Sequence, residues 1–210
     1  MGNRIGVLFD LDGVLLDTEG FYSELWEKVN DRFPTGVPNF SQVIKGSNLE
    51  KILNTYFAPE HHDDIVSMLG EFQRNMRYNF FNGVTEFLVA LKQAGIPMCV
   101  VTSSDEAKMQ AVYAQHPHFT DFFDAIVVGN MVTRCKPDPE CFLMGAERIG
   151  CNIADCYVFE DSFSGLAAGM AAGAHVIALA TTNSRESLKG KANKIIDNFV
   201  GFTIDDMLSV

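Results

Sequence analysis

Five short apolar runs, spread along the chain, are the feature that most constrains its fold. They cover residues 5–9, 98–101, 125–128, 156–159 and 176–179, each bounded by polar or turn residues. Such runs without alternation are typical of strands buried on both faces of a parallel sheet. Between the last four runs lie segments with helical spacing, such as 84–91 before Gly95 and 142–149 before Gly150. Strands that alternate with helices predict a doubly wound, Rossmann-like α/β sheet.

The alternation fails once, because about 90 residues separate the first run from the second. One crossover helix needs far fewer residues, so a domain is inserted there. Apolar residues within the gap follow helical spacing over 21–33, 49–56 and 65–76, and no strand pattern appears. We therefore predict an all-helical cap domain at 18–81 and an α/β core made of 1–17 and 82–210. Two linkers on one side of a sheet form a hinge, so the cap could act as a lid.

Chemically active residues follow the strands directly, where ligands bind in doubly wound sheets. They are Asp10, Asp12, Thr102, Ser103, Lys136, Glu160 and Asp161. Asp10 and Asp12 are two residues apart, so in extended chain their side chains leave on the same face. Up to four carboxylates at one edge could not all stay ionised without a cation. A hard divalent ion, most simply Mg²⁺, is implied. A solvated acidic loop is the alternative, and the neighbouring Thr and Lys argue against it.

Four motifs in this order resemble those of the haloacid dehalogenase superfamily. They are FDLDGV at 9–14, Thr102 after an apolar strand, KPDP at 136–139, and EDS at 160–162 followed by Gly165. The resemblance runs over almost the whole chain, because the insertion sits where β-phosphoglucomutase-like phosphatases of that superfamily carry a small helical cap of the C1 type. It implies the Rossmann-like fold, a cap domain and chemistry on a phosphate ester.

The resemblance implies a role for each matching residue. Asp10 would be the nucleophile that attacks phosphorus and forms an aspartyl-phosphate. Asp12 would protonate the leaving alkoxide and then activate water. Thr102 and the Ser103 amide would hold the phosphoryl oxygens, and Lys136 would neutralise the charge that grows on them.

The same resemblance implies a magnesium site. Asp161, Asp10 and the carbonyl of Asp12 would bind Mg²⁺, and Glu160 would either bind it or support the residues that do. In the cap, residues around Tyr22, Lys45, Gly46 and Asn48 would contact the leaving group; they are the candidates for substrate specificity.

The expected function is an Mg²⁺-dependent phosphatase acting on a small phosphorylated metabolite, with a sugar phosphate as the expected substrate, and two further functions are weighed against it. The first is a sugar phosphomutase, which in this subfamily typically carries a His four residues after the first-loop Thr and an Arg after Lys-Gly in the cap. Tyr22 follows Thr18 at that distance and Lys45-Gly46 is followed by Ser47-Asn48-Leu49, so both groups are missing and a phosphatase is favoured. The second is a receiver-like phospho-Asp signalling module, which has no such insertion.

The net charge and the cysteine content limit which partners and which cellular compartment we expect. Subtracting 27 acidic from 16 basic residues gives a net charge of −11, which disfavours nucleic-acid surfaces. Five cysteines without a C-x-x-C pair are expected to be reduced thiols, and the N-terminus has no signal-peptide pattern, so we expect a cytoplasmic protein. The uncharged stretch 162–184 is expected to be a buried helix and strand rather than a membrane span. We expect a monomer or weak homo-oligomer.

Overall fold

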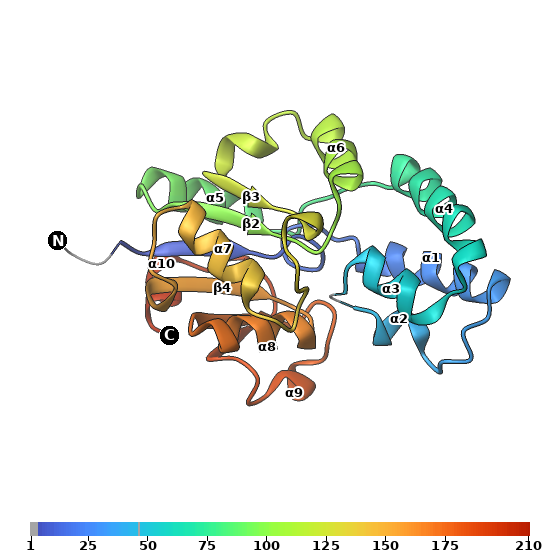
Figure 1. Cartoon of the computed structure of the whole chain (residues 1–210). Coiled ribbons are helices and arrows are strands. Elements are labelled where there is room, and N and C mark those ends of the chain that lie inside the picture. Colours follow the sequence, from blue (N-terminus) through green and yellow to red (C-terminus); the bar gives the residue numbers. More distant parts are fainter. Residues whose placement is uncertain (1–3, 46) are drawn as a thin grey trace.

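A single parallel sheet forms the centre of the molecule (Figure 1). The computed structural model describes residues 4–45 and 47–210, and within them six strands pair in the order β3-β2-β1-β4-β5-β6. The strands are β1 (Gly6–Phe9), β2 (Met98–Val101), β3 (Ala125–Val127), β4 (Cys156–Glu160), β5 (His175–Leu179) and β6 (Lys194–Ile196). The predicted doubly wound fold is confirmed. Strand β6 was not predicted, because Lys194-Ile195-Ile196 contains only two apolar residues and shows no apolar run.

Helices cover both faces of the sheet, as its buried strands require. They are α5 (Val84–Gln93), α6 (Glu106–Gln115), α7 (Glu140–Arg148), α8 (Phe163–Ala172), α9 (Arg185–Leu188) and α10 (Ile204–Leu208), with 3₁₀ turns at Phe119–Phe122 (η2), Gly129–Met131 (η3) and Ile153–Asp155 (η4). Side chains of α5, α6 and α10 share one apolar core, and those of α7, α8 and α9 share the other. Helix α8 is the small-residue helix expected from the sequence. A Cβ at its Gly169 would lie 3.0 Å from Val176, which shows how closely it approaches the sheet.

The insertion is helical, as predicted, and lies beside one end of the sheet (Figure 1). It comprises α1 (Glu19–Arg32), α2 (Phe40–Val43), α3 (Leu49–Tyr56), a 3₁₀ turn η1 (Pro59–His61) and α4 (His62–Asn75). These helices enclose an apolar core of their own, in which the Trp26 ring packs edge-on against Phe40 with 5.9 Å between ring centroids. Short α2 was not predicted, because four residues span hardly one helical turn.

The two connections between sheet and insertion run side by side. The Asp17 amide donates to the Asn79 carbonyl at 2.9 Å, and the Phe81 amide donates to the Leu15 carbonyl at 3.0 Å. We propose the domain boundaries at this paired crossing, between residues 17 and 18 and between 81 and 82. Paired linkers allow a hinge motion without disturbing the sheet.

The sheet order fixes where a ligand can bind. All strands are parallel, but the order in which the chain adds them changes side at β1, which pairs with β2 on one side and β4 on the other. Outside the carboxyl ends of strands at such a switch point lies the usual ligand site of doubly wound folds. Asp10 follows β1 and Glu160 ends β4, so both stand at this point.

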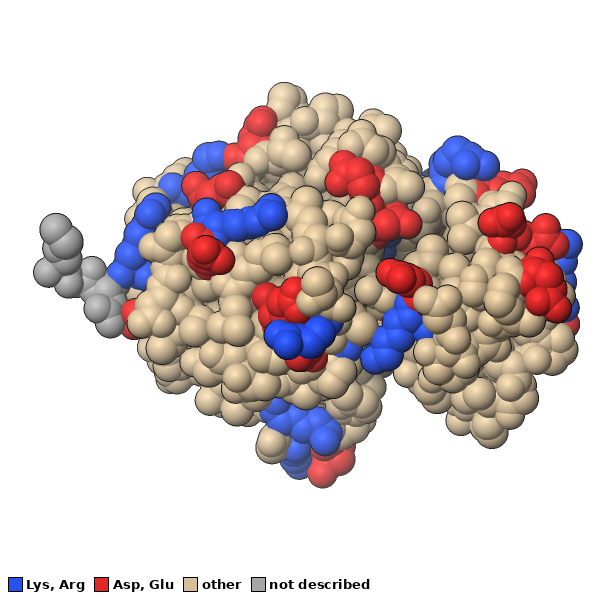
Figure 2. Space-filling model, in the orientation of Figure 1, with Lys and Arg blue, Asp and Glu red and all other residues tan. Residues whose placement is uncertain are grey.

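The surface and the helices bear on possible partners. On the face shown in Figure 2, basic and acidic side chains are interspersed rather than gathered into one basic patch. Among the described residues, no helix has the length and apolar character that crossing a membrane demands.

Candidate active site

A cavity of about 130 Å³ lies between the carboxyl end of the sheet and the helical insertion. From the core it is lined by strand-end loops that carry Asp10, Asp12 and Thr102, and from the insertion by Tyr22 and Trp26. Polar groups that converge in a concave pocket are typical of a small-molecule site.

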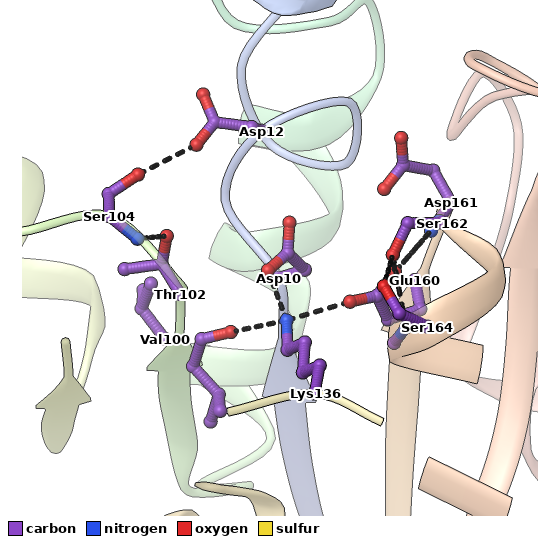
Figure 3. A network of polar contacts seen from close by, with 12 residues as sticks. Asp10, Asp12, Val100, Thr102, Ser104, Lys136, Glu160, Asp161, Ser162 and Ser164 are labelled. Carbon is purple, nitrogen blue, oxygen red and sulfur yellow. Dashed lines mark hydrogen bonds and ion pairs between the residues drawn. The ribbon is translucent and has the colours of Figure 1, made fainter. Parts of the chain in front are cut away.

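Lys136 joins the ends of two neighbouring strands (Figure 3). Its ammonium donates to Asp10 Oδ1 at 2.5 Å, to Glu160 Oε1 at 2.7 Å and to the Val101 carbonyl at 3.2 Å. These three acceptors use all three N–H donors of the lysine. The other oxygen of Asp10 points away from Lys136, toward Asp12.

Burial and charge set the ionisation of this cluster. Burial raises the pKa of Asp10 to about 8; Lys136 lowers it, and Glu160 and Asp12 raise it further. Burial alone would lower the pKa of Lys136, but the carboxylates of Asp10 and Glu160 raise it, so the lysine stays charged. The carboxylates of Asp10 and Glu160 thus share one ammonium, so a further cation beside them would be electrostatically favourable.

Glu160 is fixed on both oxygens. Oε1 accepts from Lys136, while Oε2 accepts from the amides of Asp161 and Ser162, both at 2.9 Å, and from Ser162 Oγ at 3.0 Å. Glycine is required beside it, because a Cβ at Gly165 would lie 1.7 Å from Oε1. Glu160 therefore orients Lys136.

Asp12 is held by three donors. Oδ1 accepts from Thr18 and from the Lys108 ammonium, and Oδ2 accepts from Ser104 Oγ at 2.9 Å. Burial would raise the pKa of Asp12, but the ion pair with Lys108 and the three hydrogen bonds hold the pKa below its usual range.

Thr102 and Ser103 lie where β2 ends and line the cavity, as predicted for residues at this edge. The Thr102 hydroxyl accepts from the Ser104 amide at 3.0 Å, which tightens the turn. A Cβ at Gly129 would lie 2.4 Å from the Ser103 carbonyl oxygen, so this glycine lets the neighbouring loop pack against the turn.

Asp161 lies against the loop that follows β1. A Cβ at Gly13 would lie 2.1 Å from Asp161 Oδ2 and 2.8 Å from Thr182 Oγ1, and Gly13 has φ of +74°. Among the described residues, the Thr182 hydroxyl is buried without a hydrogen-bond partner. A carboxylate, a loop carbonyl and an unsatisfied hydroxyl thus meet beside Gly13.

The acidic residues do not form one cluster of four. Within 4–45 and 47–210, no three His, Cys, Asp or Glu side chains gather as a metal-binding group. Both oxygens of Asp12 and both oxygens of Glu160 accept from protein donors, whereas Lys136 bonds to one oxygen of Asp10 and the other points away from it. Asp10, together with Asp161 beside Gly13, is therefore the candidate carboxylate pair for a cation. Mg²⁺ is commonly held by one or two carboxylates with waters and phosphate oxygens, so this smaller set fits it.

The cap residues predicted to contact substrate separate into two groups. Tyr22 and Lys45 line the cavity. Asn48 caps α3 by accepting from the Lys51 amide at 2.9 Å and lies in a different hollow, toward Pro137. Gly46 lies outside the described residues.

Sequence reasoning missed three residues around Asp12: Lys108, Ser104 and Thr18. A signal existed for Lys108, since it lies in the first turn of the helix after β2 and helical side chains lean toward the N-terminus. A lone lysine in a helical pattern otherwise indicates a solvated face.

Comparison with known proteins decides the family. A family model described as haloacid dehalogenase-like hydrolase matches residues 7–179, which include β2 to β5, most of β1 and the whole insertion. The chain belongs to this family. The predicted relationship to the haloacid dehalogenase superfamily is thereby confirmed.

Several curated relatives of this hydrolase are phosphatases. It is 31% identical over 183 residues to hexitol phosphatase A of Escherichia coli (strain K12), covering 83% of this chain and 82% of that protein. It is 30% identical over 174 residues to fructose-1-phosphate phosphatase YqaB of the same strain, covering 80% and 92%. The prediction of a phosphatase is confirmed at this level. The chain spans only 54% of another relative, the bifunctional riboflavin kinase/FMN phosphatase of Arabidopsis thaliana.

A solved structure shows the same architecture over the whole chain. The crystal structure of a HAD hydrolase, family IA, variant 3, from Entamoeba histolytica HM-1:IMSS aligns with a TM-score of 0.82 at 25% identity, covering 98% of each chain. The core and the cap of this hydrolase therefore follow a known arrangement.

Proposed function

We propose that this hydrolase is a Mg²⁺-dependent phosphatase that cleaves a small sugar phosphate or related phosphorylated metabolite through an aspartyl-phosphate on Asp10. One observation carries the proposal. Asp10 stands at the switch point of the sheet with one oxygen fixed by Lys136 and the other directed toward Asp12 in the cavity between sheet and insertion. A fixed carboxylate beside a second carboxyl group and an ammonium is suited to displacement at phosphorus.

The substrate class is supported by the relatives and by the cavity. Two relatives are named for a hexitol and for fructose 1-phosphate. The cavity has hydroxyl groups at Ser23, Ser41 and Ser47, and the ring of Trp26. Hydroxyls and an aromatic face suit a polyhydroxy leaving group.

The first step transfers the phosphoryl group to the enzyme. The free oxygen of Asp10 forms a bond to phosphorus, and the bond from phosphorus to the ester oxygen breaks. The negative charge of the bound phosphate ester raises the pKa of Asp12 from the low range in which Lys108 holds it, so Asp12 can carry the proton that it gives to the departing alkoxide. Thr102 and Ser103 border the cavity at the place for the phosphoryl oxygens, and Lys136 balances charge on them.

The second step returns the enzyme to its starting state. Asp12, now a carboxylate, takes a proton from water, and that water oxygen bonds to phosphorus. The bond between phosphorus and Asp10 breaks, which frees inorganic phosphate and the Asp10 carboxylate. Thr18 and Ser104 keep Asp12 directed at the cavity through both steps.

Magnesium fits beside Gly13. Asp10, Asp161 and the carbonyl of Asp12 would hold it, and the unsatisfied Thr182 hydroxyl could bond to one of its waters. When bound, the ion would neutralise phosphate charge and the excess carboxylate charge of the cluster. Glu160 would support this site indirectly, because both of its oxygens bind Lys136 and backbone or hydroxyl donors.

The phosphatase is preferred over the two alternatives. A mutase must grip a second phosphate, and the position four residues after Thr18 holds Tyr22, whose hydroxyl accepts from Gln73 at 3.2 Å. A receiver-like module has no observation in its favour, because the family match spans the helical insertion. We also propose a cytoplasmic location, since all five cysteines are free thiols. The protein is proposed to be a monomer or weak homo-oligomer.

A substrate panel with one substitution tests the proposal. Phosphate release from sugar phosphates and p-nitrophenyl phosphate is measured with Mg²⁺ and with a chelator, for wild type, Asp10→Asn and the exposed control Asp17→Asn. We expect Mg²⁺-dependent release that Asp10→Asn abolishes and Asp17→Asn retains. Turnover that persists in Asp10→Asn would overturn the assignment of the nucleophile. A magnesium-induced rise in melting temperature that Asp161→Asn removes would support the metal site independently of activity.

A further inference from the structure

Lys108 is a buried cation that the reaction steps above do not use. It lies in the first turn of α6 with only 2% of its surface exposed, and it lines the cavity. Its ammonium pairs with Asp12 Oδ1. Burying an ammonium costs free energy, so a buried lysine on the leaving-group side of the site indicates a functional role.

The same ammonium touches the cap. It lies 4.2 Å from the centroid of the Tyr22 ring, on α1, and the Tyr22 hydroxyl accepts from Gln73 on α4. Lys108 therefore stands where the catalytic loop of the core meets the wall of the insertion. A leaving group attached to an oxygen at Asp12 must extend past this point.

The ammonium has donor capacity to spare. Lysine carries three N–H donors. Asp12 accepts one and the face of the Tyr22 ring attracts another, and in the part of the chain that the structure describes the Lys108 ammonium has no further hydrogen-bond acceptor. A nearly buried cation with an unused donor, at a cavity wall, fits an oxygen acceptor on the ligand.

We infer that Lys108 is a specificity-determining residue that donates a hydrogen bond to a hydroxyl on the carbon next to the phosphoester carbon. This inference rests on the proposed function, because it takes Asp12 as the group that meets the ester oxygen. Lys108 then selects phosphomonoesters of vicinal diols, which include sugar and polyol phosphates, over simple alkyl phosphates.

The geometry of a vicinal diol matches the ion pair. Oxygens on adjacent carbons can lie within hydrogen-bonding distance of each other, and so do the Lys108 ammonium and Asp12 Oδ1. The ester oxygen can therefore meet Asp12 while the neighbouring hydroxyl meets Lys108. A hydroxyl one carbon further along the chain reaches this spacing only when one more rotatable bond is fixed, which costs entropy.

Three matched substrates test the inference: propyl phosphate, 1,2-propanediol 1-phosphate and 1,3-propanediol 1-phosphate. The ratio of kcat/KM for each is measured with wild type, Lys108→Met and the exposed control Lys28→Met. A hydrogen bond to a charged group contributes about 1.5–3 kcal/mol, so wild type should prefer the 1,2-diol ester over propyl phosphate by about 10- to 150-fold. Lys108→Met should bring that ratio near unity, and Lys28→Met should keep it.

The outcomes separate this inference from the proposed function. Equal loss on all three substrates in Lys108→Met, with the preference intact, would show a merely structural role and overturn the inference. Equal rates on the three substrates in wild type would overturn it even if Lys108→Met failed to fold. Failure of wild type to release phosphate from any substrate, including p-nitrophenyl phosphate, would refute the proposed function itself.

Discussion

Replacing Gly165 by alanine tests how Glu160 holds Lys136. The new Cβ would lie 1.7 Å from Glu160 Oε1 and 2.4 Å from Oε2, whereas real Cβ contacts are essentially never under 3.0 Å. The carboxylate must therefore move by more than 1 Å. That displacement breaks its bonds to Lys136 and to the donors of Asp161 and Ser162.

The size of the effect follows from these lost bonds. Disrupting a buried, charge-paired carboxylate costs about 3–5 kcal/mol. Alanine returns about 1 kcal/mol through its better helix propensity. We expect a net loss of about 2–4 kcal/mol, a fall in Tm of about 5–15 °C at this chain length. Loss of one charged hydrogen bond to Lys136 should lower kcat/KM by about 100-fold.

Gly169→Ala is the matched control on the same helix. Its Cβ would meet only the apolar side chains of Val176 and Val158, at 3.0 and 3.2 Å, so a small shift relieves it. Thermal melting and p-nitrophenyl phosphate hydrolysis are compared for the two variants. If Gly165→Ala proved as stable and as active as Gly169→Ala, the account of Glu160 as the support of Lys136 would be refuted.

Two further predictions concern buried charge and buried thiols. Lys136→Met should lose phosphatase activity and about 3–5 kcal/mol of unfolding free energy, because Asp10 and Glu160 are left without their shared ammonium; urea unfolding that matches wild type would contradict this. Burial raises the pKa of Cys99 and Cys156 to about 12, so the folded chain keeps protons that the unfolded chain loses above its usual value of 9.0. The contribution of these thiols to the free energy of unfolding is fully present below pH 9. It declines as the pH rises toward 12, by about 1.4 kcal/mol per pH unit for each thiol. The urea midpoint should accordingly drop between pH 8 and pH 10, and an unchanged midpoint would count against the buried thiols.

The arrangement of strand ends could be predicted because it depends on local pattern and topology. Short apolar runs predict five of the strands, and the rule that ligands bind at their carboxyl ends predicts that Asp10, Lys136 and Glu160 lie together, as they do. The insertion was visible as a gap in the alternation. Each of these inferences uses only residue order and the handedness of parallel sheets.

What the sequence could not show is which partner each carboxylate takes. The sequence placed four acidic residues at one edge of the sheet, yet in the structure Asp12 pairs with Lys108 while Asp10 and Glu160 share Lys136, and this choice depends on packing between segments far apart in the chain. Lys108 pairs directly with Asp12, 96 residues away in the chain, and the same ammonium also contacts the ring of Tyr22 in the cap. Such pairings are tertiary and leave no periodic signal.

The most direct test of the central claim is to trap the phosphoryl group on the enzyme. A single turnover with phosphate-labelled substrate and Mg²⁺ is quenched in acid, digested and mapped by mass spectrometry. We predict label on the peptide that contains Asp10 in wild type and none in Asp10→Asn. Label on any other residue, or label that persists in Asp10→Asn, would contradict the account.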